Sequence, residues 1–229
     1  MAKGAGENLI EIQQLARELH EKLKHEFGKE LFQMSGNLLL GNCYGKSNRI
    51  FLGLNPGGSE NDSELCVALE GKNFWDSDSL WPYWKNCKTF VNGANGLHEW
   101  MTPATAAFCC PWRTRNKGDL DALNERTGGK LFEYCKCLMG MLVEHHRAHS
   151  SSPALTVVAA GRESLYLMAR FMGFEWSKRQ TYHVGSHTYQ WAKVEHNDLL
   201  IYQVPHFSRA NSCKRLTDCA EWLASDLGL

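Results

Sequence analysis

The chain has 229 residues, of which 43% are hydrophobic and 22% are charged, values typical of a soluble globular domain with a sizeable core. Its 25 basic and 25 acidic residues cancel, so the net charge does not indicate a polyanionic partner, although a basic patch on one face stays compatible with it. The sequence has no apolar run of roughly 18 residues and no apolar leader, which excludes a membrane-spanning helix and predicts a cytoplasmic protein.

The nine cysteines indicate reduced thiols rather than a disulfide framework. Nine is an odd number, and the spacings at Cys109-Cys110 and Cys135-x-Cys137 are poor for disulfides. Zinc ribbons and iron–sulfur sites usually show CxxC pairs, and this sequence has none. We therefore expect the cysteines to be small core residues, and we predict no metal and no cofactor.

The first predicted element is a helix over 7–27, because its apolar residues recur at helical spacing and form one stripe. We therefore expect residues 1–30 to form an N-terminal helix. The short apolar run at 49–54 predicts a buried strand. Residues 71–100 are rich in glycine, asparagine and aromatic side chains, and we expect an insert that is mostly loop with one helix near 82–91.

Beyond residue 100 the apolar segments alternate between strand-like and helical patterns. Segment 104–110 is a second apolar run, the pattern of 129–148 is strongly helical, and Asn197-Asp198 is typical of a hairpin link. The remaining predicted elements are strands over 155–160, 187–195 and 198–204 and helices over 161–171 and 212–227. This alternation predicts a three-layer α/β/α sandwich with a mainly parallel central sheet, in a single domain over 1–229.

The strand over 49–54 stops abruptly at the sequence NPGG. Pro56 presets one backbone angle, while Gly57 and Gly58 allow positive φ and let another molecule approach the main chain closely. Asn55 is then a polar amide at the carboxyl end of a strand, where open α/β sheets place ligands. Two later strands also end in conspicuous loops, at 111–117 and 205–212. If these strands are parallel, all three loops meet at one edge of the sheet and form a site.

Three segments carry a family resemblance: GLNPG at 53–57, AFCCPWR at 107–113 and VPHFSRANS at 204–212. Together they resemble the uracil-DNA glycosylase superfamily, and the first is similar to the opening motif of its mismatch-specific and single-strand-selective branches. The resemblance implies a uracil-DNA-glycosylase-like fold and a monomer that acts on single- or double-stranded DNA. It implies a monofunctional DNA glycosylase in base excision, serving DNA repair or defence against phage.

The chemistry of glycosidic cleavage fits two of these residues. Breaking an N-glycosidic bond leaves an oxocarbenium-like sugar and an anionic departing base, so a catalyst needs an oriented water and a hydrogen-bond donor at the base. Asn55 can orient the water through its amide oxygen, and His206 can donate from a neutral imidazole at a loop tip. We therefore predict these two as the catalytic residues, without a lysine for Schiff-base chemistry.

The target nucleotide must leave the stack to reach such a site, which calls for a base pocket and for DNA contacts. The predicted pocket residues are Leu54, Pro56, Phe108, Trp81 and Tyr83. Phe207 and Arg209 suit a minor-groove wedge, and the amides of Gly57, Gly58 and Ser59 suit an anion nest. The predicted phosphate contacts are Arg113, Arg115, Lys117, Ser208, Asn211, Ser212, Lys214 and Arg215.

One residue departs from the family pattern. The resemblance implies an asparagine three residues before Pro111, where it reads the uracil edge, but Phe108 stands there. Phenylalanine stacks on a base and cannot distinguish its polar edge, so the substrate is either uracil or a modified cytosine such as a phage hypermodified base. The residues that could compensate are Asn116 and the aromatic group Trp75, Trp81, Tyr83 and Trp84.

Two other functions stay open at this point. The first is a catalytically inactive nucleic-acid-binding module on the same fold, which the loss of the reading asparagine allows and the presence of both Asn55 and His206 opposes. The second is an unrelated hydrolase using Glu60, Asp62 or Asp119, although these carboxylates are typical of turns and caps.

Overall fold

The computed structural model describes residues 5–28, 39–40, 47–54, 75, 82–112, 114, 117–149, 154–176, 180–184, 187–207 and 213–229. The helices in this part of the chain are α1 (Ala5–Phe27), α2 (Pro82–Val91), α3 (Leu97–Met101), α4 (Lys117–Arg126), α5 (Lys130–His149), α6 (Arg162–Met172) and α7 (Cys213–Leu227). The strands are β1 (Leu39–Leu40), β2 (Arg49–Gly53), β3 (Thr105–Phe108), β4 (Leu155–Ala160), β5 (Gln180–Val184), β6 (His187–His196) and β7 (Leu199–Val204).

The strands form one mixed sheet in the order β1-β3-β2-β4-β7-β6-β5. Its centre, β3-β2-β4-β7, is parallel throughout. β1 at one end and the β6–β5 hairpin at the other are antiparallel to their neighbours. The predicted α/β class is therefore confirmed, and the parallel part of the sheet is its central four strands.

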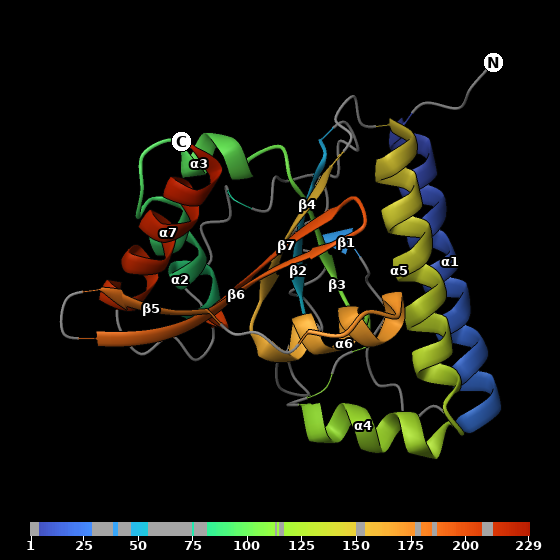
Figure 1. Ribbon diagram of the computed structural model, residues 1–229. Helices are drawn as coiled ribbons and strands as arrows, with labels where there is room; N and C mark the ends of the chain where they lie inside the picture. The colour runs from blue at the N-terminus through green and yellow to red at the C-terminus, as the bar shows by residue number, and fades with distance from the viewer. Residues whose placement is uncertain are drawn as a thin grey trace.

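Helices cover both faces of this sheet, as Figure 1 shows. On one face, α1, α5 and α6 pack with side chains such as Ile50 and Leu52 of β2. On the other face, α2, α3 and α7 pack with Phe51 of the same strand. This alternation follows from the two-residue period of a strand, and it explains why β2 is an unbroken apolar run in the sequence. We call the buried cluster that includes Ile50 and Leu52 the α5-side core, and the buried cluster that includes Phe51 the α7-side core.

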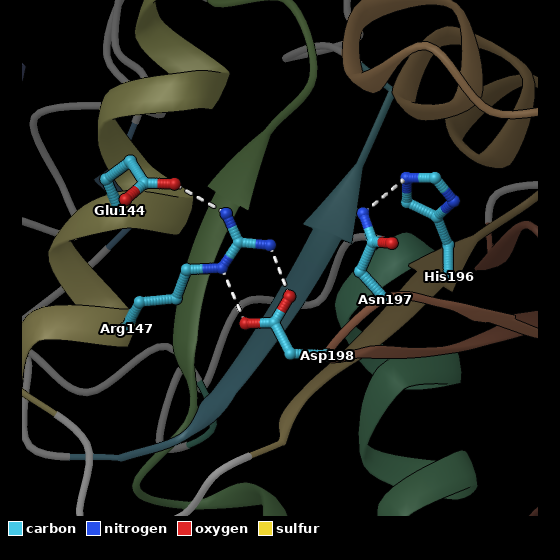
Figure 2. A network of polar contacts seen from close by, with 5 residues as sticks. All are labelled: Glu144, Arg147, His196, Asn197 and Asp198. Carbon is cyan, nitrogen blue, oxygen red and sulfur yellow. Dashed lines mark hydrogen bonds and ion pairs between the residues drawn. The ribbon is translucent and has the colours of Figure 1, made fainter.

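The link between β6 and β7 is the hairpin turn that the sequence predicts. Asn197 has φ 53°, a left-handed conformation that asparagine tolerates. Arg147 of α5 grips the turn, because its Nε donates to Oδ2 of Asp198 at 2.6 Å and its second terminal nitrogen bonds Oδ1. Figure 2 shows this fork, with Glu144 on the other side of the guanidinium. A side chain on α5 therefore holds the turn of a hairpin that lies far from it in the sequence.

The predicted helices and strands correspond to α1, α2, α5, α6 and α7 and to β2, β3, β4, β6 and β7. The sequence patterns do not predict β1, β5, α3 or α4. Except for its last residue, α3 lies in the 71–100 insert, which we expect to be mostly loop. Residues 55–74 and 76–81 lie outside the described residues, so the expected insert at 71–100 is described at residue 75 and from residue 82 on. Within the described part of the chain, every helix is too short or too polar to cross a membrane.

Candidate functional site

The parallel strands place the site at one edge of the sheet. The next strand in the sequence after β2 is β3, which pairs with one edge of β2. The strand after that, β4, pairs with the opposite edge of β2, so the direction in which strands are added reverses between β2 and β4. Open α/β sheets bind ligands at the carboxyl ends of strands, at such a reversal. The carboxyl ends of β2, β3 and β7 all lie at this edge, as expected for parallel strands.

The chain after β2 stays paired with the chain after β3. The amide of Cys109 donates to the carbonyl of Gly53 at 2.8 Å, and that of Cys110 donates to Leu54 at 3.0 Å. The Phe108 ring lies directly on Gly53, where a β-carbon would come within 2.9 Å of its Cδ1. Glycine is therefore required at this position for the ring to pack. Asn55 follows this braced segment directly and lies outside the described residues.

His206 follows β7 and packs on the end of β4. The amide of Gly161 donates to the carbonyl of Val204 at 2.8 Å, which extends the pairing of β4 and β7 by one residue. A β-carbon on Gly161 would lie 3.0 Å from both Cβ and Cδ2 of His206. Gly161 also has φ +92° and immediately precedes α6, so its lack of a side chain serves both the turn and the imidazole.

Helix α2 supports the same loop from the α7-side core. The Phe207 ring is fully buried and packs against Phe51 at a centroid distance of 5.8 Å and against Phe90 at 5.3 Å. The Asn86 amide of α2 donates from Nδ2 to the Phe207 carbonyl at 2.6 Å. Tyr83 lies edge-on to both loop rings, 6.2 Å from His206 and 5.8 Å from Phe207. His206 is thus held between β4 and α2 while staying partly exposed.

No protein-family model and no curated protein matches the chain. The assignment of a function therefore depends on the residues and their arrangement.

The described residues of the predicted base pocket do not share one face of the sheet. Phe108 belongs to the α7-side core, and Tyr83 packs against this core. Leu54 is 7% exposed and belongs to the α5-side core, so its side chain packs away from the other two. Burial raises the pKa of Tyr83 well above its usual value, and a hydrogen bond with Cys87 adds to the shift, so its hydroxyl stays protonated at neutral pH. The structure therefore brings Tyr83, and not Leu54, to His206.

The prediction that Phe207 is a minor-groove wedge is wrong. Its side chain is 0% exposed and fills the core among rings of β2 and α2, so inserting it between base pairs would empty that site. Sequence spacing could not show this, because the partner rings come from segments over 100 residues away in the chain. Phe207 is an anchor for the loop that carries His206.

The predicted DNA contacts that the structure describes lie on two helices. Lys117, the first residue of α4, forms an ion pair with Asp121 and lies over the Tyr166 ring, with Nζ 5.0 Å from its centroid. Lys214 is exposed in the first turn of α7, and Arg215 beside it is partly buried. Asp119 is an exposed residue in the first turn of α4, an ordinary place for a carboxylate at a helix N-terminus.

Many predicted site residues lie outside the described residues. They are Asn55, Pro56, Gly57, Gly58, Ser59, Trp81, Arg113, Arg115, Ser208, Arg209, Asn211 and Ser212, together with the alternatives Glu60, Asp62 and Asn116. Of the aromatic group proposed to compensate for the missing asparagine, Trp75 is buried against Phe51, at a centroid distance of 5.1 Å, and is a core residue.

Two residues that contact the loop bearing His206 were not predicted as site residues from the sequence. One is Gly161, which contacts His206 itself, and a glycine between an apolar strand and a helix was the available signal for a close approach. The other is Asn86, which bonds the Phe207 carbonyl. Asn86 had no such signal, because it is 121 residues from Phe207 along the chain. Among the described residues, no three His, Cys, Asp or Glu side chains are grouped to hold a metal ion.

Proposed function

We propose that the protein is a monofunctional DNA glycosylase with a uracil-DNA-glycosylase-like fold. It flips a pyrimidine out of DNA and hydrolyses its N-glycosidic bond, leaving an abasic site. The observation that carries the proposal is the position of His206, held partly exposed at the sheet edge where the strand order reverses, next to the end of β4. We infer that it acts in the cytoplasm as a monomer.

The sheet register relates the two proposed catalytic residues. Leu52, Ala159 and Gln203 lie in one row across β2, β4 and β7. In the sequence, Asn55 comes three residues after Leu52, and His206 comes three residues after Gln203. Neighbouring strands lie about 4.8 Å apart, so β2 and β7, on either side of β4, are about 10 Å apart. Segments that leave two strands this far apart can present side chains to one sugar–base linkage from opposite sides, which supports the proposal.

In this proposal the two side chains divide the reaction between them. The Asn55 amide oxygen orients a water below the sugar, and the His206 imidazole donates a hydrogen bond to the oxygen of the departing base, where negative charge develops. An amide is too weak a base to remove a proton from the water early, so the glycosidic bond breaks first and the water then adds to the oxocarbenium-like sugar. The proton that the water loses passes through solvent and neutralises the departing base anion. The rate then depends strongly on how stable the departing base is as an anion.

The base that is removed is either uracil or a modified cytosine. Phe108 is an apolar residue, 7% exposed, where the family resemblance implies a polar amide. An aromatic ring recognises a base by stacking and shape rather than by its hydrogen-bonding edge. The same observation supports the second candidate, a catalytically inactive module that binds nucleic acid.

Incubation with modified DNA distinguishes these two functions. Oligonucleotides carrying uracil, hydroxymethylcytosine or glucosylated hydroxymethylcytosine are incubated with the protein and then treated with alkali, which cleaves abasic sites. The proposal predicts cleavage of at least one of them, abolished by His206→Ala. Binding to all three without any abasic product would favour the inactive module.

A further inference from the structure

Helix α2 lies outside the three segments that carry the family resemblance, yet it holds the loop that bears His206. We propose that Asn86 is a positioning residue that fixes the His206 imidazole through the Phe207 carbonyl. The catalytic consequence of this inference rests on the proposed function, whereas the positioning itself does not.

The residues on both sides of His206 are fixed. Pro205 is buried, and its ring locks its own φ near −65°. Phe207 is held at its ring by the α7-side core and at its carbonyl by the Nδ2 of Asn86, 2.6 Å away. The intervening residue therefore has little backbone freedom, and its imidazole lies between the Gly161 backbone and the Tyr83 ring.

The hydrogen bond from Asn86 is the polar part of this clamp. The ring contacts fix where Phe207 lies, but rotation of its peptide group is opposed by the bond to its carbonyl oxygen. Without that bond the loop can turn about the buried ring, which moves His206 relative to β4. Misplacing a catalytic group by about 1 Å can cost about 100-fold in rate, so a single hydrogen bond here matters to the chemistry.

Asn86→Asp isolates this contact, because it keeps the shape of the side chain and replaces the donor with an acceptor. At about pH 8 the new carboxylate faces the Phe207 carbonyl, and we expect the single-turnover excision rate to fall about 10- to 100-fold. Lowering the pH protonates the carboxyl group, which then donates its O–H to the carbonyl. The rate relative to wild type at the same pH should therefore recover as the pH falls. Loss of structure alone would not be reversed by protonation.

Asn92→Asp is the matched control. Asn92 is exposed in the turn that follows α2, so the same chemical change there should leave excision and its pH profile unchanged. The dissociation constant for the modified DNA, measured by fluorescence anisotropy, should stay within about threefold of wild type for both variants, because Asn86 acts on the imidazole and not on the phosphates.

The ring resonances of ¹⁵N-labelled histidine give a second measurement that does not need an active enzyme. The His206 signal is assigned by its absence in His206→Gln. In Asn86→Asp this signal should be shifted or broadened relative to wild type at about pH 8, and it should approach the wild-type signal at the same pH on acidification. In Asn92→Asp the signal should match that of wild type throughout. An unchanged His206 signal in Asn86→Asp would overturn the positioning role. A shifted signal in a protein that excises no base would reject the proposed function and keep the positioning.

Discussion

His206 and Gly161 are in direct contact, and a side chain at position 161 would crowd the imidazole. A β-carbon there would lie 3.0 Å from both Cβ and Cδ2 of His206, on a backbone with φ +92°. The contact joins the loop after β7 to the end of β4, and it places the imidazole at the edge where the parallel strands end.

Gly161→Ala should therefore impair catalysis as well as stability. The added methyl group displaces the imidazole, and we expect the excision rate to fall at least about 10-fold. The stability loss should be about 1–3 kcal/mol, because φ 92° with ψ 158° is a backbone conformation that essentially only glycine adopts. Gly173→Ala is the control, because Gly173 has φ +75° but no atom within 4 Å of an added β-carbon. Its backbone is in the left-handed helical region, which other residues tolerate better, so this variant should lose no more stability than Gly161→Ala in urea unfolding and should keep its excision rate. Equal rates for both variants would remove the role assigned to the contact.

Phe207→Ala should be among the most destabilising substitutions in the loop. Removing a fully buried ring leaves a cavity in the α7-side core, and such changes cost about 3–5 kcal/mol. Ile10→Ala is the comparison, since Ile10 is 70% exposed and should change stability by less than about 0.5 kcal/mol. Chemical denaturation measures both. A stability for Phe207→Ala close to that of wild type would mean that the ring is free for another role.

Acid should destabilise the protein through buried histidines. Burial lowers the pKa of His20 and of His145 from 6.5 to about 4, with smaller contributions from Lys24 for the former and from His146 and His149 for the latter. Between these values the unfolded chain binds more protons than the native one, so stability falls as the pH falls from about 6.5 to about 4. Each histidine should lower the free energy of unfolding by up to about 2 kcal/mol as the pH falls from about 7 to about 5.

Urea unfolding of wild type and of His145→Gln across this range tests the linkage. In the variant, the free energy of unfolding should depend less steeply on pH than in wild type, because glutamine does not titrate in this range. The stability of the variant at neutral pH also changes, so the slopes and not the absolute values are compared. A wild-type stability that is constant from about pH 7 to pH 5 is incompatible with two histidines held neutral in the core.

The clamp on the β6–β7 turn should contribute measurably to stability. Arg147→Ala removes the fork to Asp198 that Figure 2 shows, and a partly buried bidentate pair of this kind is worth about 1–2 kcal/mol. Glu144→Ala removes the other partner of Arg147, whose side chain is 69% exposed, and should cost less than about 0.5 kcal/mol. The opposite order of the two losses would show that the turn is held by other contacts. Thermal unfolding at low salt resolves this difference.

Strong local patterns made much of the fold predictable. β2 and β4 are unbroken apolar runs, and α5 has a clear helical stripe, so sequence spacing alone located them. Helix α4 was missed because it buries only Leu120 and Leu123, too few for a recognisable stripe. β1 has two residues and β5 lies at the end of the sheet, and such short or terminal strands depend on partners that the local sequence does not show.

The position of the candidate site was predictable, but its support was not. Parallel strands with conspicuous loops imply a common edge, and the observed pairing places His206 there. Whether Phe207 points to solvent or to the core depends on rings from β2 and α2, and the bond from Asn86 spans 121 residues. Contacts of this kind follow from tertiary packing, which no local pattern records.

The central claim is that Asn55 and His206 act on one glycosidic bond. Single-turnover excision by wild type, Asn55→Ala, His206→Ala and the double variant, on whichever modified base the protein removes, measures this most directly. We predict that each single variant loses at least about 100-fold and that the double variant loses clearly less than the product, because residues that act in one step are not additive. Wild-type rates in both single variants would contradict the claim.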